Sequence, residues 1–406
     1  MNNSFPNQKK LLLLGGLRYL LPVIKIAHKL GIYVITADYL PNNFAHKFSD
    51  LYLDVSILDK EAVLNLAKEL KIDGIMSFAV DPGVMTAAYV AEKLSLPFQG
   101  SYEAVKILQN KDLFREFLKK NGFNVPKSKG FSDIAEAIEE IKSWDLPVIV
   151  KPVDSAGSKG VSKVSNIGEI HDAIKEALRE SHSSRFIIEE FISPEGFPSD
   201  SECFSVDGNL SVCTFSDQYF DALAPNPFTP AAYVWPSSME IGNKKELKDE
   251  LQRLITLLQL KTGIYNVETR VGTNGKPYIM EMSPRGGGNR LAEMVDSLFH
   301  TKLIENSVRN AVGLPLLDST PIIPDSYLAE VVIHTEKSGY FKNLEIAEEI
   351  KPYVREIDLW VKPGDEVTSF KGANNSLGTI VLNFPDQLTC KNNLRDLSLW
   401  LKVIID

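Results

Sequence analysis

Two acidic residues close neighbouring apolar segments late in the chain: Glu268 ends 264–268 (I-Y-N-V-E) and Glu281 ends 278–281 (Y-I-M-E). Between them, T-N-G-K at 273–276 is a turn signal typical of a β-hairpin. A hairpin brings the two carboxylates to neighbouring positions on one sheet, where they repel each other unless a cation lies between them. Magnesium suits that position, because it takes one or two carboxylates together with phosphate oxygens and water. Two solvated strand-end acids are the alternative, and each acid taken alone leaves the choice even.

Three consecutive glycines, 286–288, come directly after Arg285. A backbone without side chains can approach a ligand closely. Arg285, four residues past Glu281, can offer two hydrogen bonds to a phosphoryl or carboxylate oxygen. A structural loop explains the glycines but not the arginine and the two acids beside them. The segment therefore predicts an anion-binding loop next to the metal.

A second loop of small residues, 154–161 (D-S-A-G-S-K-G-V), follows an apolar strand that ends at Lys151. Amides and hydroxyls of such a loop can surround phosphate oxygens, although a flexible linker has the same composition. A lysine at the end of a buried strand is costly unless it meets an anion. Lys111, before a predicted helix, is a second candidate cation, and a solvated helix lysine is its commoner explanation.

The segment 186–192 (F-I-I-E-E-F-I) is an apolar strand interrupted by Glu189 and Glu190. Its backbone groups could bind the edge of an adenine ring, and Glu202 is placed to accept hydrogen bonds from ribose hydroxyls. An ordinary strand with solvent-facing acids explains both segments when they are considered alone.

The elements that must position these residues differ along the chain. In the first hundred residues, strand and helix signals alternate, which predicts a parallel sheet with helices on both faces. The expected strands are 10–15, 33–37 and 74–78, and the expected helices are 18–30, 59–70 and 82–94. Gly15-Gly16 and the later Asp38 invite a dinucleotide-binding interpretation, but the full G-x-G-x-x-G is absent. We therefore expect a Rossmann-like domain that holds no nicotinamide.

Further along, two helices at 101–108 and 111–121 precede the candidate site, and 193–201 and 217–238 are expected to be loops. The aromatic segment 219–235 either lines an acceptor pocket or packs as a surface loop. Beyond about residue 321, short β-rich segments predict a small antiparallel cap. The predicted fold class is thus a multidomain α/β and α+β protein.

In this order, the motifs resemble those of the ATP-grasp superfamily: Lys111, P-V-I-V-K-P, D-S-A-G-S-K-G-V, I-E-E-F-I, N-V-E-T-R and M-E-M-S-P-R-G-G-G. The resemblance covers roughly 101–310 and implies ATP-grasp central domains after the Rossmann-like domain. The implied division is 1–100 (Rossmann-like), 101–185 (ATP-grasp N-terminal part with a phosphate lid), 186–320 (ATP-grasp C-terminal part with the magnesium site) and 321–406 (β-rich cap). The cap is similar to that of the L-amino-acid ligase branch, and of relatives that act on other carboxylates.

The resemblance also implies roles for individual residues. Nucleotide binding would involve Lys111, Lys151, Ser155, Gly157, Ser158, Gly160, Glu189, Glu190, Ile192 and Glu202, with the backbone of Glu189 and Ile192 on adenine and Glu202 on ribose. Metal binding would involve Glu268, Glu281 and Ser283, the last at a position where many members carry asparagine. Catalysis would depend on Arg285 and Lys151, which stabilise the transferring phosphoryl group.

The implied activity is an ATP-dependent ligation with Mg²⁺, or Mn²⁺ as the alternative metal. A small-molecule carboxylate is activated as an acyl phosphate and joined to an amine, with amino-acid ligation as one form of the reaction; ADP and phosphate are released. One alternative is a formate- or bicarbonate-activating enzyme of nucleotide-precursor metabolism. A phosphorylated substrate would need further cations, and the candidates are Arg18, Arg270 and Arg290. The other alternative is a non-catalytic ATP-binding protein.

The composition of the chain limits the classes of partner that we expect. The 406 residues carry a net charge of −9, which argues against a broad nucleic-acid surface because phosphate backbones require clustered lysine and arginine. Three cysteines without C-x-x-C spacing indicate reduced thiols, and no apolar stretch approaches the length of a membrane span. We therefore expect a cytoplasmic protein without membrane partners, and a homodimer is the default oligomer.

Overall fold

The N-terminal part is built on a parallel sheet. A computed structural model describes residues 8–406 of the protein. The strand order is β3-β2-β1-β4, and the strands are β1 Lys10–Leu14, β2 Tyr33–Ala37, β3 Leu51–Leu53 and β4 Gly74–Ser77. All three pairings between these strands are parallel, as the alternating pattern predicts.

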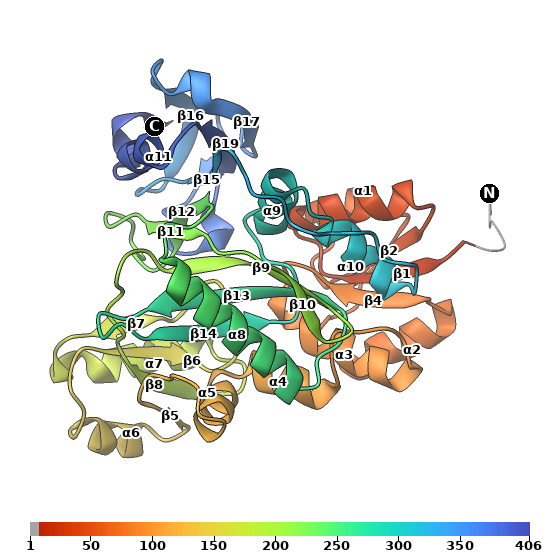
Figure 1. Cartoon of the computed structure of the whole chain (residues 1–406), viewed down its shortest axis with the longest axis horizontal. Coiled ribbons are helices and arrows are strands. Elements are labelled where there is room, and N and C mark those ends of the chain that lie inside the picture. Colours follow the sequence, from red (N-terminus) through yellow and green to blue (C-terminus); the bar gives the residue numbers. More distant parts are fainter. Residues whose placement is uncertain (1–7) are drawn as a thin grey trace.

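Helices cover both faces of this sheet, with α1 on one side and α2 and α3 on the other (Figure 1). Their bounds are α1 Leu21–Lys29, α2 Lys60–Leu70 and α3 Asp81–Leu94. Residues 11–14 of β1 are all leucine and fully buried, because the strand has apolar neighbours on both faces. Two later helices, α9 Leu291–Phe299 and α10 Leu303–Ala311, join the same hydrophobic core and connect this domain to the rest of the chain.

A second sheet carries Lys151 of the candidate site, and Lys111 begins a helix of the same region. Its strand order is β5-β8-β6-β7, with bounds β5 Ser128–Phe131, β6 Val148–Pro152, β7 Ser162–Val164 and β8 Phe186–Glu190. The helices of this region are α4 Tyr102–Gln109, α5 Lys111–Lys120, α6 Ile134–Ile141 and α7 Ile170–Glu180. The two helices that we predicted before the site correspond to α4 and α5.

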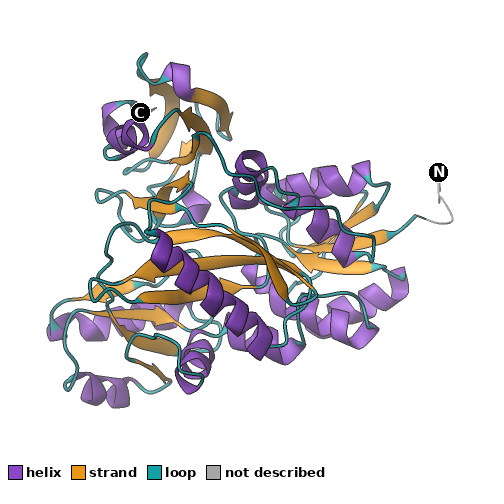
Figure 2. Ribbon diagram, viewed as in Figure 1, coloured by secondary structure: helices purple, strands orange, loops and turns teal. Residues whose placement is uncertain are grey.

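A third, antiparallel sheet carries the two acids, in the order β10-β9-β13-β14. Its strands are β9 Ser199–Val206, β10 Asn209–Cys213, β13 Gly263–Val271 and β14 Pro277–Ser283, and the long helix α8 Ile241–Leu257 packs on it (Figure 2). The predicted hairpin between β13 and β14 is present, and Gly275 in its turn has φ of +72°. Glycine suits this left-handed conformation because it has no Cβ to clash.

The last region is richer in strands than the sequence suggested. A five-stranded sheet has the order β11-β12-β15-β19-β17, and a small sheet has the order β18-β16-β20. The strands are β11 Asp217–Phe220, β12 Pro230–Trp235, β15 Tyr327–Ile333, β16 Gly339–Ile346, β17 Val354–Leu359, β18 Glu366–Val367, β19 Gly378–Phe384 and β20 Leu401–Ile405, and α11 spans Gln387–Leu394. The cap lies at one end of the molecule (Figure 1).

The expectation that 217–238 is a loop was wrong, because β11 and β12 lie in this segment. Strand β11 pairs with β12, and β12 pairs with β15, about a hundred residues further along the chain; β12 also supplies the fully buried Trp235 to the core. Proline and aromatic residues suggest a loop locally, but long-range pairing and burial decide the conformation. Both strands precede residue 320 and yet share a sheet with the cap, and the domain boundaries given above stay a prediction.

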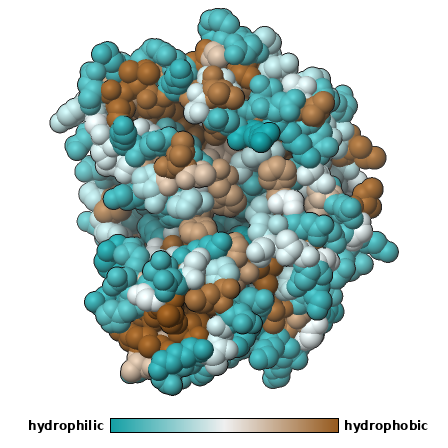
Figure 3. Space-filling view, turned by 90° about the vertical axis from the view of Figure 1, so that its left-hand side faces the viewer, coloured by the Kyte–Doolittle hydropathy of each residue, from teal (hydrophilic) through white to brown (hydrophobic). Residues whose placement is uncertain are grey.

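The surface seen in Figure 3 is mostly hydrophilic, and its hydrophobic residues lie in separate patches. Among residues 8–406, no helix is both long enough and apolar enough to cross a membrane.

Candidate active site

The two predicted metal ligands face each other across β13 and β14. Glu268 is in register with Glu281 on one side and with Asp200 of β9 on the other, so three carboxylates form a row across the sheet. Among the described residues, no set of three or more His, Cys, Asp or Glu side chains is arranged to hold a metal ion. The pair Glu268 and Glu281 nevertheless fits Mg²⁺, since that ion takes one or two carboxylates and completes its shell with phosphate oxygens and water.

The polar face of this sheet results from strand periodicity. Asp200 and Glu202, two residues apart, lie on the same face of β9, and the registers place Asn266 and Ser283 there as well. The opposite face includes Cys203, Tyr265, Val267 and Met282, which share a hydrophobic core with α8. The apolar face therefore anchors the sheet, and the polar face is left for chemistry.

Two acids on this face were treated differently by the sequence reasoning: Glu202 was singled out and Asp200 was missed. Burial raises the pKa of Asp200 to about 7, and the charge of Glu268 adds to the effect, while a hydrogen bond from Asn266 opposes it. Burial raises the pKa of Glu202 to about 8, against the hydrogen bond from the Gly287 N–H. The sequence signal for Asp200 was its spacing of two residues from Glu202 in D-S-E, which places both side chains on one face of a strand. Crowded acids of this kind favour a bound cation.

Arg285 is held by the N-terminal domain. Its Nε and Nη2 donate to the two carboxylate oxygens of Asp81 at 2.8 and 2.6 Å, and its Nη1 donates to the carbonyl of Gly286 at 3.0 Å. Ser283 donates to the same aspartate at 3.1 Å and accepts from Gln109 at 2.7 Å, so its hydroxyl is already engaged. Burial opposes ionisation of Asp81, but the Arg285 guanidinium outweighs it and holds the pKa below its ordinary value.

Glycine is required at positions 286 and 287 because neighbouring side chains leave no room for a Cβ atom. A Cβ on Gly286 would lie 2.3 Å from the Phe78 ring, and one on Gly287 would lie 2.5 Å from the carboxylate of Glu202. The Gly287 N–H donates to that carboxylate at 2.7 Å. The loop thus packs on the N-terminal domain on one side and on β9 on the other. Glu202, which was expected to accept from ribose hydroxyls, is fully buried beneath the loop, where its carboxylate accepts from the Gly287 N–H and from Asn266.

The two predicted phosphate-binding lysines lie near acids. Lys151 pairs with Glu189 at 2.6 Å, and Arg115, which the sequence reasoning missed, pairs with the same carboxylate at 2.7 Å. Lys111 lies 3.3 Å from Glu281 and donates to the carbonyl of Ser155 at 2.9 Å. Burial lowers the pKa of Lys151, and Glu189 opposes the effect while the charges of Arg115 and Lys111 add to it. Lys111 therefore lies beside a predicted metal ligand and the small-residue loop, and Lys151 lies beside Glu189.

The predicted lid, 154–161, is a loop with several residues in the left-handed backbone conformation. Gly157, Ser158 and Gly160 all have φ between 59° and 68°. Ser158 donates to the carbonyl of Phe228, which precedes β12. At the other end, Asp154 accepts from Ser181 and from two backbone N–H groups after α7, which fixes the start of the loop.

The segment 186–192, whose backbone is expected to bind adenine, is only partly free to do so. Glu189 lies in the centre of the sheet between β5 and β6, and the N–H of Glu190 donates to the carbonyl of Lys127 at 2.8 Å. Ile192 lies past the end of β8, and its carbonyl accepts from Arg270 at 3.0 Å. The adenine and ribose contacts of Glu189, Glu190, Ile192 and Glu202 stay predictions.

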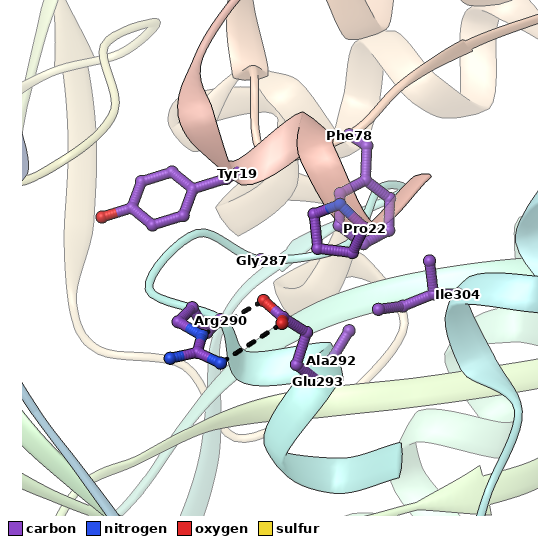
Figure 4. A pocket seen from close by; sticks show the side chains of 8 residues that line it. All are labelled: Tyr19, Pro22, Phe78, Gly287, Arg290, Ala292, Glu293 and Ile304. Carbon is purple, nitrogen blue, oxygen red and sulfur yellow. Dashed lines mark hydrogen bonds and ion pairs between the residues drawn. The ribbon is translucent and has the colours of Figure 1, made fainter. Parts of the chain in front are cut away.

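A small cavity of about 10 Å³ lies where the N-terminal domain meets the glycine loop. Tyr19 and Phe78 line it from one side and Gly287, Arg290 and Glu293 from the other, with Arg290 and Glu293 paired (Figure 4). Of the three arginines considered for a phosphorylated substrate, only Arg290 is paired with acids among the described residues. Arg18 stacks on Phe44, Arg270 binds a carbonyl, and Arg290 pairs with Glu293 and Glu356.

Known proteins match both the sequence and the fold. Residues 144–293 match the ATP-grasp domain family. The N-terminal section of the carbamoyl phosphate synthase large chain from Aquifex aeolicus is 24% identical over 263 residues, 64% of this chain and 44% of the relative. The chain thus spans less than half the length of that relative.

Solved structures match nearly the whole chain. The L-amino acid ligase from Bacillus licheniformis has a TM-score of 0.81 at 22% identity and covers 98% of this chain and 99% of its own. Phosphoribosylglycinamide synthetase from Anaerococcus prevotii has a TM-score of 0.75 at 23% identity, covering 98% and 100%. The chain therefore contains an ATP-grasp domain within an ATP-grasp fold, which confirms the resemblance and the fold class predicted from the sequence.

Replacing Asp81 by asparagine should destabilise the protein. The Arg285 guanidinium would remain buried without its counter-charge, and the loss of such a partner costs about 3 kcal/mol or more. Urea unfolding measures the effect. Glu103→Gln, which removes an exposed pair with Lys106, is the control and should change little. Equal stability of the two variants would contradict the role assigned to Asp81.

The Glu189 cluster predicts a pH-dependent stability. Burial favours the protonated acid, but Arg115 and Lys151 hold the pKa at about 2, below the ordinary 4.5. A depressed folded-state pKa contributes stability above the ordinary value that is lost as pH falls through the folded value. The stability difference between wild type and Glu189→Gln should therefore shrink as pH falls from 4.5 toward 2. Denaturant unfolding across pH measures it, and a difference that does not vary with pH would contradict the assignment.

Proposed function

We propose that the protein is an ATP-dependent, Mg²⁺-requiring ligase that phosphorylates a carboxylate and joins the acyl phosphate to an amine, releasing ADP and phosphate. The observation that carries the proposal is the pairing of Glu268 with Glu281 beside Lys111 and the Arg285 loop. This arrangement offers two carboxylates for a metal on one face of a sheet, with cations for phosphate oxygens on the helix and loop beside it. Phosphoryl transfer needs little more than such positioning and charge stabilisation.

The charge of each side chain would determine its role in the reaction. Bound Mg²⁺, held by Glu268 and Glu281, supplies charge neutralisation for phosphate oxygens. Lys111 and Lys151 would bind those oxygens, and loop 154–161 would cover them and exclude water, which otherwise hydrolyses an acyl phosphate. Arg285, oriented by Asp81, would stabilise the transferred phosphoryl group and then the oxyanion formed when the amine attacks.

The engaged hydroxyl of Ser283 supports a metal site that rests on two carboxylates. Its hydrogen bonds to Asp81 and Gln109 give it a structural role next to the metal, in place of the third ligand expected from the resemblance. Mn²⁺ as an alternative metal, a cytoplasmic location and a homodimer remain part of this proposal.

The alternative of a formate- or bicarbonate-activating enzyme with a phosphorylated substrate needs cations that can bind the phosphate. Arg290 is paired with Glu293 and Glu356, whereas Arg18 contacts an aromatic ring and Arg270 a carbonyl, so that neither has an acid partner among the described residues. A non-catalytic ATP-binding protein would share the fold, and turnover separates it from the ligase.

Replacing Glu281 by glutamine should abolish ADP release and leave the fold intact, because it removes one metal-binding charge from a half-exposed side chain. ADP is measured by a coupled assay with ATP, Mg²⁺ and pools of carboxylates and amines. The control is Glu240→Gln, an exposed acid before α8 that makes no capping hydrogen bond.

Wild-type ADP release should require both a carboxylate and an amine. A wild-type protein that binds ATP but releases no ADP with any pool would contradict the proposed ligase and support the non-catalytic alternative.

A further inference from the structure

A row of polar side chains crosses the five-stranded sheet of the cap. The strand registers align Gln218 of β11 with Tyr233 of β12, Tyr233 with Glu330 of β15, and Glu330 with Val381 of β19. Because partners in register point to the same face, these side chains form one line across the sheet. An acid in the middle of such a sheet is unusual and calls for an explanation.

This row faces the N-terminal domain and helix α9 and not the core of the cap. Tyr233 and Val381 belong to the hydrophobic core shared with the N-terminal domain and α9. The residues on either side in the strands, such as Val234 and Val331, belong to the core of the cap. Glu330 therefore points toward the N-terminal domain and the glycine loop.

Glu330 has no partner in the described structure. It is fully buried, and neither of its carboxylate oxygens accepts a hydrogen bond. The side-chain oxygen of the buried Gln218 also lacks one. Arg290, whose charge acts on Glu330, gives its hydrogen bonds to Glu293, Glu356 and Thr379. The unsatisfied atoms of the row are thus all acceptors, and a buried acceptor without a donor is costly.

The environment of Glu330 disfavours its charge. Burial raises its pKa well above the ordinary value, and the charge of Glu293 adds to the effect while Arg290 opposes it. A carboxyl in this position gains most from a ligand that brings both a positive charge and hydrogen-bond donors.

The row connects to the loop that carries Arg285. Asn289, four residues further on, donates to the Tyr233 hydroxyl at 3.1 Å and accepts from the Tyr19 hydroxyl at 3.0 Å. Asn289 and Arg290 both have positive φ, 47° and 59°, a strained conformation for residues with a side chain. The loop therefore bridges the N-terminal domain and the cap directly beside the row.

We propose that Glu330, with Gln218 and Tyr233 beside it, binds the ammonium group of a substrate. The inference rests on the proposed ligase function and names the chemical class of its substrate: an ammonium-bearing compound such as a free amino acid. A phosphorylated compound is disfavoured here, because the row is acidic and the neighbouring Arg290 is paired with acids.

Entry of the substrate requires a change in the loop. The cavity beside Arg290 holds about 10 Å³, enough for about one water molecule. Glu330 does not line this cavity, and Asn289 links the hydroxyls of Tyr19 and Tyr233 by two hydrogen bonds, so access to Glu330 requires the loop to move. The strained backbone of Asn289 and Arg290 favours such a rearrangement.

The test compares wild type with Glu330→Gln, and Glu345→Gln, an exposed acid of β16 in the cap, is the control. Binding of each of the free L-amino acids and of their N-acetyl derivatives is measured by calorimetry in the presence of a non-hydrolysable ATP analogue. Glu330→Gln should weaken binding of free amino acids about 10- to 100-fold, the usual effect of losing a charge-assisted hydrogen bond. N-acetyl derivatives should bind poorly to all three proteins.

Turnover identifies which substrate carries the ammonium. With hydroxylamine in place of the amine, hydroxamate formation depends on the carboxylate substrate alone. A raised KM for that substrate in Glu330→Gln places the ammonium on the carboxylate donor, whereas a raised KM for the amine with unchanged hydroxamate formation places it on the acceptor.

Several results would overturn the inference. Wild type and Glu330→Gln could bind free amino acids equally well, or wild type could bind none of them. N-acetyl derivatives could bind more tightly than the free amino acids. A lower melting temperature of Glu330→Gln would show that Glu330 has a structural role instead. Glu330-dependent binding without any turnover would overturn the proposed ligase function and leave the ammonium site standing.

Discussion

The structure depends on one electrostatic constraint: four carboxylates share the polar face of a single antiparallel sheet. Asp200, Glu202, Glu268 and Glu281 are brought together by the registers of β9, β13 and β14. Burial and the neighbouring acids raise the pKa of Asp200 and Glu202, and among the described residues no lysine, arginine or histidine forms an ion pair with either of them. A face of this kind is suited to a cation and to a ligand that arrives with one.

The surrounding elements provide the apolar packing and the ion pairs that hold the sheet in place, so that its polar face stays available. Helix α8 covers the apolar side of the sheet, so that the polar side needs no further packing. Asp81 reaches from the N-terminal domain to Arg285, and the glycine loop packs between Phe78 and Glu202. The same loop then meets the cap through Asn289 and Tyr233. The site is thus assembled from three parts of the chain, which explains why nearly the whole chain has the ATP-grasp architecture.

Features with local signals could be predicted from the sequence, and features that depend on distant pairing could not. The parallel N-terminal sheet and the β13–β14 hairpin follow from alternating patterns and an Asn-Gly turn, and both are present. Asp81 contacts Arg285 across 204 positions, and nothing in its own segment indicates that contact. Strands β11 and β12 were expected to be loops for the same reason. In its own segment, Glu330 is one acid in an apolar strand. The order and register of the strands are needed to tell which face of the sheet its side chain lies on.

The central claim is that ATP activates a carboxylate as an acyl phosphate. The most direct measurement supplies a carboxylate labelled with oxygen-18 and analyses the released phosphate by mass spectrometry. Attack of the carboxylate on the γ-phosphoryl group, followed by attack of the amine, leaves one labelled oxygen in the phosphate. Product formed together with unlabelled phosphate, or with AMP in place of ADP, would contradict the account.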